Sequence, residues 1–197
     1  MMIVRKIFIL LFFYFSFTSS SWSQNASEFI SDLSIKASNI LSSKLSDDEK
    51  IVQLKEIGEN SVDIEGVGFY TLGKHRKTLT EAQKKQYKEL FRNYFLKSFS
   101  GRLVGYSDAK IAVLSEEVKN EKYTIVYSKL IGTSDRPEVK IDWRVYTKDP
   151  ENPLIRDLII EGLSLARTQK EEFNSIIVNN DGSIEALFEN LSKFLEN

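Results

Sequence analysis

The stretch EVKIDWRVYTK, residues 138–148, alternates between apolar and charged side chains. Apolar residues stand at positions 139, 141, 143 and 145, and charged residues stand at positions 140, 142 and 144. Because successive side chains of a β-strand point to opposite faces, a period of two is typical of a half-buried strand. The stretch therefore predicts a sheet with one apolar face and one polar face.

Neighbouring stretches extend this sheet on both sides. Similar patterns occur in KIAVLSEEVK (110–119), in KYTIVYSKLIG (122–132) and, after the breaker DPENP, in LIRDLIIEG (154–162). The connections between them are short, and short connections join antiparallel neighbours. We therefore expect a four-stranded antiparallel meander.

Helical patterns flank the four strands. The segments expected to be helical are 26–45, 46–60, 80–99, 163–178 and 183–195. Ser46 and Glu49 form a capping box, and Thr80 caps the longest helix. The order of helices, strands and helices favours the α+β class, with the helices packed on one face of the sheet. No repeat or linker divides residues 24–197, so we expect a single domain.

Residues 1–23 have the pattern of a secretory signal peptide. Arg5 and Lys6 precede the apolar run IFILLFFYFSF, and the stretch 21–23 fits a cleavage site between small residues. The apolar run is too short to span a bilayer comfortably, which favours a cleaved signal over a membrane anchor. We therefore expect the chain to be exported.

The composition excludes several kinds of function. The formal net charge of the 197 residues is −1, and it becomes −3 without Arg5 and Lys6, so general nucleic-acid binding is not expected. The chain has no cysteine and one histidine, which removes disulfides and most zinc, iron–sulfur and haem sites. We expect neither a metal nor a cofactor.

Few side chains fit a catalytic site. His75 lies in KHRK without a nucleophile motif beside it, which favours a surface position at a helix end. Asp142, Asp157 and Glu161 are candidates for paired carboxylates in acid–base chemistry. The commoner alternative for such residues is to cap turns or to pair with arginines, and we expect no enzyme.

The glycine-rich stretch GVGFYTLGK, residues 66–74, does not fit a nucleotide site. A dinucleotide fingerprint needs its third glycine earlier and follows a strand, whereas here the third glycine is Gly73 and the preceding segment is helical. A phosphate-binding loop needs serine or threonine after Gly-Lys, and His75 stands there.

The run from Lys74 to Arg102 is basic. It holds nine lysines and arginines against only Glu81 and Glu89. Two interpretations stay open: a solvated helix face, or a surface that docks a partner or faces a lipid headgroup.

Two blocks of the chain resemble the MlaC family, also called the toluene-tolerance family, of periplasmic phospholipid-binding proteins. The first block consists of Leu72-Gly73, the helix start Thr80-Glu81-Ala82-Gln83 and the aromatic stretch 91–95. The second consists of Asp157, three apolar residues, Glu161-Gly162-Leu163-Ser164 and Phe173. The resemblance covers about residues 62–195. It departs from the family pattern at His75, Arg76, Arg156 and Lys170.

The resemblance implies a soluble periplasmic carrier that holds phospholipid tails in an apolar pocket between helices and sheet. Such a carrier exchanges lipid with an outer-membrane lipoprotein complex and an inner-membrane ABC transporter complex, and it maintains outer-membrane lipid asymmetry. It is expected to act as a monomer and has no catalytic residues. The alternative is a periplasmic protein-interaction module with a filled core and no ligand.

Apolar residues on the expected inner surfaces are predicted to line the pocket. They are Val67, Tyr70, Tyr94, Val113, Ile125, Ile141, Trp143, Val145, Leu158, Ile160 and Leu163. Periodicity alone does not separate a filled core from a cavity lined by the same residue types.

The stretch GVGFYTLGK is predicted to form one wall of this pocket. We expect a short helix from about Ile64 with Val67 and Tyr70 directed inward, and Gly73 at its C-terminal end. Glycine within a helix is unfavourable, and a close approach of the sheet or of a lipid tail would explain its presence.

Overall fold

The computed structural model describes residues 25–106, 110–133 and 137–197. The predicted signal peptide lies outside these residues. The helices are α1 (Ala26–Leu41), α2 (Asp47–Ser61), α3 (Ile64–Thr71), the 3₁₀ helix η1 (Gly73–Lys77), α4 (Glu81–Leu103), α5 (Leu165–Val178) and α6 (Ile184–Glu196). The strands are β1 (Ile111–Asn120), β2 (Tyr123–Leu130), β3 (Val139–Tyr146), β4 (Leu154–Ile160) and β5 (Leu163–Ser164).

Local side-chain hydrogen bonds begin the helices where the sequence predicts. The hydroxyl of Ser46 accepts from the backbone N–H of Glu49, whose carboxylate accepts in return from the backbone of Ser46. Thr80 and Gln83 make the same reciprocal pair at the start of α4. These capping boxes satisfy N–H groups that the first helical turn leaves without a partner.

The sheet is an antiparallel meander in the order β1-β2-β3-β4-β5. The prediction of four strands missed β5, which has two residues and follows a tight turn at Glu161 and Gly162. Both turn residues have positive φ, 49° and 82°, as a two-residue hairpin turn requires. The predicted helix from Leu163 therefore begins only at Leu165, after the short strand.

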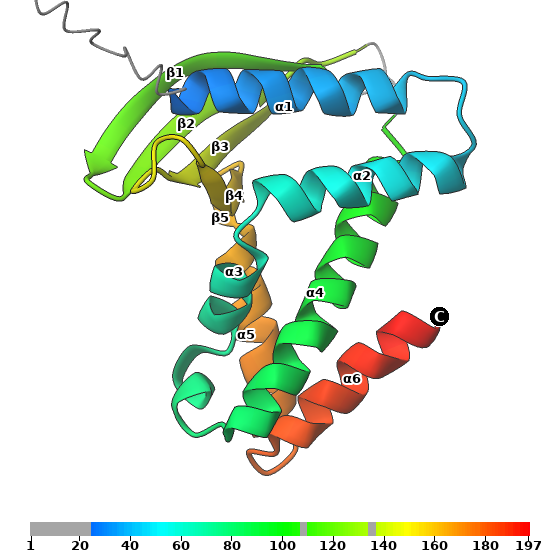
Figure 1. Ribbon diagram of the computed structural model, residues 1–197, viewed down its shortest axis with the longest axis vertical. Helices are drawn as coiled ribbons and strands as arrows, with labels where there is room; N and C mark the ends of the chain where they lie inside the picture. The colour runs from blue at the N-terminus through cyan, green and yellow to red at the C-terminus, as the bar shows by residue number, and fades with distance from the viewer. Residues whose placement is uncertain (1–24, 107–109, 134–136) are drawn as a thin grey trace, which may run out of the picture.

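α1 lies across the sheet, and α3 and α5 extend from the side of β4 and β5 (Figure 1). α1 packs on β1 and β2, and α3 and α5 pack on β4. α4 contacts α2, α3 and α6. The opposite sheet face carries the ion pairs Lys119–Glu117 and Lys140–Asp142, together with the buried Ile125. The separation into an apolar and a charged side is therefore confirmed for β3.

A backbone connection ties the start of α3 to the sheet. Val62 forms an isolated parallel bridge with Ile155, and the N–H of Asp63 donates to the carbonyl of Ile155 at 3.0 Å. The Asp63 carboxylate caps α3 by accepting from the N–H of Gly66 at 2.9 Å. The same carboxylate binds the guanidinium of Arg156. The backbone bridge and the Asp63–Arg156 ion pair therefore hold the start of α3 against β4.

Among the described residues, no helix is both long enough and apolar enough to cross a bilayer.

Candidate functional site

The helix-facing side of the sheet presents rows of apolar side chains. Strand pairing places one residue from each strand in each row, and the rows follow one another along the strands. From one end to the other the rows contain Ile111, Leu130 and Val139; then Val113, Ser128, Ile141 and Ile160; then Glu116, Val126, Trp143 and Leu158; and finally Val118, Thr124, Val145 and Ile155. We call this surface the apolar sheet face.

Burial changes along the apolar sheet face. Val126 and Val145 are fully buried, and Ile155 is nearly so, whereas Val118, at the β1 edge of the row of Val145 and Ile155, is 69% exposed. Towards the other end of the face, the described residues leave Ile111, Val113 and Ile160 only half-buried. Large apolar side chains on a face covered by helices are normally buried completely, so this end offers apolar surface to a ligand.

The polar side chains of this face already have hydrogen-bond partners within the protein. The indole N–H of Trp143 donates to the hydroxyl of Ser128 at 2.8 Å, and that hydroxyl donates to the carbonyl of Ile141 at 2.8 Å. The carboxylate of Glu116 accepts from the N–H of Ser27 at the start of α1. These groups are already paired, so the face would meet a ligand through apolar contacts.

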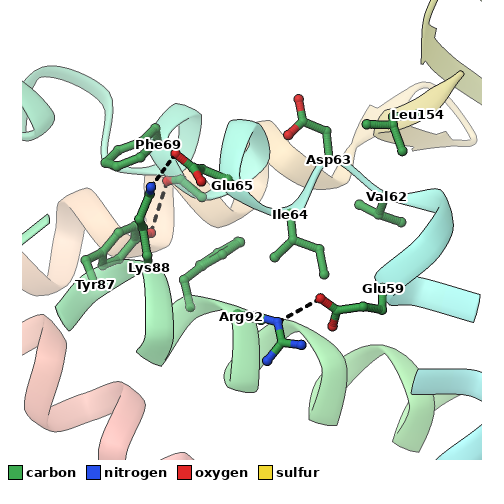
Figure 2. Close-up of a pocket in the computed structure, with 12 residues that line it drawn as sticks. Glu59, Val62, Asp63, Ile64, Glu65, Phe69, Tyr87, Lys88, Arg92 and Leu154 are labelled. Atoms are coloured by element: carbon green, nitrogen blue, oxygen red, sulfur yellow. Dashed lines mark hydrogen bonds and ion pairs between the residues drawn. The ribbon is translucent and has the colours of Figure 1, made fainter. Parts of the chain in front are cut away.

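Two pockets open in the helical part. The first, of about 330 Å³, lies among α2, α3, α4 and the start of β4 (Figure 2). Its lining is mainly apolar, and two ion pairs cross its rim: Lys88–Glu65 at 2.6 Å and Arg92–Glu59 at 2.8 Å. The second, of about 370 Å³, lies between η1 and α5.

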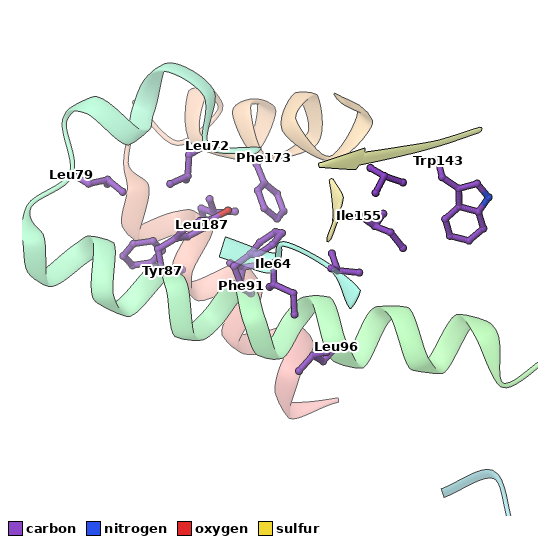
Figure 3. Close-up of a cluster of buried hydrophobic side chains, with 14 of the residues drawn as sticks. Ile64, Leu72, Leu79, Tyr87, Phe91, Leu96, Trp143, Ile155, Phe173 and Leu187 are labelled. Atoms are coloured by element: carbon purple, nitrogen blue, oxygen red, sulfur yellow. The ribbon is translucent and has the colours of Figure 1, made fainter. Parts of the chain in front are cut away.

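An aromatic core separates these pockets. Phe91 contacts the rings of Tyr87, Tyr94, Phe95 and Phe173 at centroid distances of 5.7–6.3 Å. Figure 3 shows Phe91 of α4 and Phe173 of α5 in this cluster, and Trp143 towards its sheet end. The helical core and the apolar sheet face therefore belong to one continuous hydrophobic cluster.

Within this core, Tyr87 is held protonated. Its hydroxyl lies 2.9 Å from that of Thr71 and donates to the carbonyl of Gly68 at 3.1 Å. Burial raises the pKa of Tyr87 far above its ordinary value, because the phenolate would lose its hydration. Tyr87 is therefore a neutral phenol that packs and forms hydrogen bonds within the core.

The sequence of this chain matches the MlaC protein family over residues 31–193. The chain belongs to the MlaC family. MlaC proteins are periplasmic, non-enzymatic lipid carriers, which agrees with the expectation that the chain is no enzyme. The match includes both sequence blocks on which the resemblance rests.

A solved structure has the same fold. It is a phospholipid-binding protein from Ralstonia solanacearum in complex with a phospholipid. The two chains superpose with a TM-score of 0.72 at 17% sequence identity, over 87% of this chain and 97% of that one. At this identity the likeness establishes the shared α+β fold.

The structure brings together most of the eleven residues predicted to contact lipid. Six lie on the apolar sheet face: Val113, Ile141, Trp143, Val145, Leu158 and Ile160. Val67 of α3 and Tyr94 of α4 are half-buried against the same hydrophobic cluster. None of the eleven lines either of the two pockets described above.

Three of the eleven lie elsewhere. Ile125 pairs with Arg144 and therefore points to the opposite sheet face, where it is buried. Tyr70, expected to point inward, is instead 37% exposed, with the ammonium of Lys170 over its ring. Leu163 is 60% exposed, although its pairing with Ile160 puts it at the edge of the apolar sheet face.

The eleven predicted lipid contacts do not include the half-buried end row of this face. Ile111, Leu130 and Val139 form its half-buried end row. Val139 stands in the same alternation as Ile141, and this was the signal that could have found it. The other two follow from Val139 only when the strand register is known.

The glycines of GVGFYTLGK have other neighbours than expected. A side chain on Gly68 would place its Cβ 2.7 Å from the ring of Phe91, so the close approach is by α4 rather than by the sheet or a lipid tail. Gly73 has φ +56° directly after α3, as the prediction of a helix C-terminus requires.

The polar candidates for catalysis have structural partners. His75 Nε2 lies 3.1 Å from the side-chain oxygen of Asn174. The carboxylate of Asp157 accepts from the hydroxyl of Ser164 and from the N–H of Ala166, at the start of α5. Glu161 accepts from the N–H of Lys140. Asp142 lies on the polar sheet face with its Oδ2 3.7 Å from the ammonium of Lys140, while its buried Oδ1 has no hydrogen-bond partner among the described residues. Among the described residues, no group of three His, Cys, Asp or Glu could hold a metal.

Proposed function

We propose that this protein is a periplasmic phospholipid carrier that binds acyl tails on the apolar sheet face. The observation that carries the proposal is the half-buried row of large apolar side chains between sheet and helices, in a chain of the MlaC family. The phospholipid bound by the Ralstonia protein of the same fold supports a phospholipid as the ligand.

Solubility explains why such a ligand needs a carrier. Each buried methylene contributes about 0.8 kcal/mol, so a sixteen-carbon tail in water costs on the order of 10 kcal/mol. An apolar face recovers most of this free energy, as a membrane does. Exchange between protein and membrane can then be nearly balanced, which a shuttle requires.

We place the tails against the six predicted residues of the apolar sheet face, with Val67 and Tyr94 on the helical side. Leu163 lies at the edge, where a tail would enter or leave. Ile125 and Tyr70 are left out of the proposed contact surface because they point away from it.

The biological role follows from the family. We infer that the carrier moves lipid between the outer and inner membranes and so maintains outer-membrane lipid asymmetry. Its partners would be an outer-membrane lipoprotein complex and an inner-membrane ABC transporter complex, and it would work as a monomer exported by the signal peptide at residues 1–23.

One observation favours the alternative, a protein-interaction module without a ligand. The protein's own residues bury Ile141, Trp143 and Val145, so they fill part of the predicted contact surface. Bound lipid separates the two proposals, since the module would contain none.

The substitution Leu163→Glu tests the proposed tail contact. Leu163 is 60% exposed, so a carboxylate is tolerated by the fold but would repel an acyl chain at the edge of the face. We expect the folded variant, purified without detergent, to lose most of its bound phospholipid. Ile141→Glu should have the same effect where the variant still folds.

The matched control is Val52→Glu on α2, because Val52 is 66% exposed and lies outside the apolar sheet face. We expect its lipid content to equal that of the natural protein. A folded Leu163→Glu protein with normal lipid content would remove Leu163 from the contact surface.

A further inference from the structure

The nine cations of the basic run Lys74–Arg102 differ in their partners. On α4, Lys84, Lys88 and Arg92 form ion pairs with glutamates. Lys97 donates to the last carbonyls of α6. These four cations therefore stabilise contacts within the protein.

The cations of η1 are different. Lys74, Arg76 and Lys77 are exposed, and none of them forms an ion pair within the described parts of the chain. The two further cations of the run without an ion pair there, Lys85 and Arg102, lie on α4. Three neighbouring charges on one short helix are thus left for an external partner.

A structured pocket lies beside these charges. The 370 Å³ pocket between η1 and α5 is lined by Lys74 and Lys170, with Glu171 as its carboxylate. The side chain of Lys170 can pack closely against Gly73 because the glycine has no Cβ. A Cβ there would lie 2.9 Å from Cε of Lys170. The stem of Lys170 therefore crosses the backbone of η1, and its ammonium lies 5.4 Å from the ring centre of the exposed Tyr70.

The bond between His75 and Asn174 joins η1 to α5 at the same place. We call the surface formed by η1, Tyr70 and Lys170 the basic tip. Its four cations stand against one lining carboxylate, in a chain whose formal net charge is −1. The charge of the molecule is therefore polarised, and the basic tip would turn towards an anionic surface.

We propose that the basic tip docks on the surface of an anionic phospholipid bilayer and that its pocket accepts a phosphate of a lipid headgroup. Two lysines lining one pocket suit a phosphate. Lysine and arginine near an anionic bilayer each strengthen binding by roughly fivefold. Tyr70 adds an amphipathic ring of the kind that lies at headgroup level. An acidic protein surface would need no such pocket.

Docking in this way leaves the cargo site uncovered. The basic tip lies beyond the end of α3 that is distant from the sheet, as Figure 1 shows. The proposal does not depend on the proposed function, since the apolar sheet face contributes no residue to the basic tip.

Vesicle binding tests the proposal. The exported chain would be sedimented with phosphatidylcholine vesicles that either contain or lack phosphatidylglycerol. We expect binding only to the anionic vesicles, with loss of binding at high salt. The triple substitution Lys74→Glu, Arg76→Glu and Lys77→Glu should weaken it by on the order of a hundredfold.

The matched control changes the same net charge elsewhere, by Lys44→Glu, Lys50→Glu and Lys55→Glu on and before α2. We expect the control to keep more than half of the binding of the natural protein. Equal binding of both vesicle types, or equal losses in the two triple variants, would overturn the proposal. So would the absence of vesicle binding, even if the basic tip were found to bind an acidic protein.

Two further measurements keep this proposal separate from lipid carriage. The triple variant of the basic tip should retain its bound phospholipid, and Leu163→Glu should still bind anionic vesicles. Loss of vesicle binding in Leu163→Glu would show that docking acts through the cargo and would contradict the basic tip as the docking surface.

Discussion

At the scale of single residues, Arg156 joins the sheet to the start of α3. Its guanidinium binds the carboxylate of Asp63, donates to the hydroxyl of Tyr123 at 2.7 Å, and lies 3.9 Å from the ring centre of Tyr146. The sequence marks Arg156 only as a departure from the family pattern. Its partner Asp63 lies 93 positions earlier, so local patterns could not predict the pair.

Replacing Arg156 with alanine should destabilise the protein. The change removes charge-assisted hydrogen bonds and leaves the carboxylate of Asp63, which is largely buried, without its cation. Because Arg156 itself is partly exposed, we expect the free energy of unfolding to fall by about 2 kcal/mol. Urea denaturation measures this loss.

Arg76→Ala is the control for this substitution, since Arg76 is exposed and forms no ion pair within the described residues. Its effect should stay within about 0.5 kcal/mol. If Arg156→Ala were equally mild, the contacts around Asp63 would not hold α3 to the sheet.

At the scale of elements, the helix and strand patterns differ in what they could reveal. Capping boxes at Ser46 and Thr80 are local, so both helix starts could be predicted. In β2 the two neighbours Ile125 and Val126 are both apolar, so alternation could not tell which of them faces the helices. β5 is two residues long, too short for any periodic signal.

For a related reason, the sequence pattern could not predict which side of α3 is buried. It consists of Ile64, Gly68 and Thr71, of which only Ile64 is a large apolar residue. Hydrophobic spacing therefore pointed to Val67 and Tyr70. A glycine chosen for close helix packing is invisible to a pattern of apolar residues.

Gly68→Ala tests this close packing of α3 on α4. Alanine favours a helix over glycine by about 1 kcal/mol, but its Cβ would lie 2.7 Å from a ring that neighbouring aromatics hold in place. Overpacking of this kind costs about 1–3 kcal/mol, so we expect a net loss of stability in thermal or urea unfolding.

The control is Gly101→Ala on α4, where nothing lies within 4 Å of the added Cβ. There the helix preference acts alone, and we expect a gain of about 0.5–1 kcal/mol. A gain of the same size at Gly68 would mean that Phe91 moves freely, against the packing described above.

At the scale of the whole molecule, the order of helices and strands sufficed to predict the α+β class and the meander. The separation of β3 into an apolar and a charged side also follows from alternation alone. The gradient of burial along the apolar sheet face does not, because it depends on where the helices end over the strands. The half-buried row at Ile111, Leu130 and Val139 therefore appears only in three dimensions.

The same limit applies to the basic run. The charges of the run could be counted from the sequence. Which cations of α4 form ion pairs, and that those of η1 form none among the described residues, depends on which glutamates the fold brings close to each cation. Glu59 and Glu65 come from α2 and α3 and pair with Arg92 and Lys88 across the first pocket (Figure 2). Neither glutamate lies within the run itself.

Lipid carriage is the central claim, and the lipid content of the natural protein tests it most directly. The exported chain would be purified without detergent, extracted with organic solvent, and its phospholipid measured by mass spectrometry against protein concentration. We predict phospholipid at a substantial stoichiometry, because the half-buried apolar sheet face would otherwise meet water. A protein that is folded yet free of phospholipid would contradict the account.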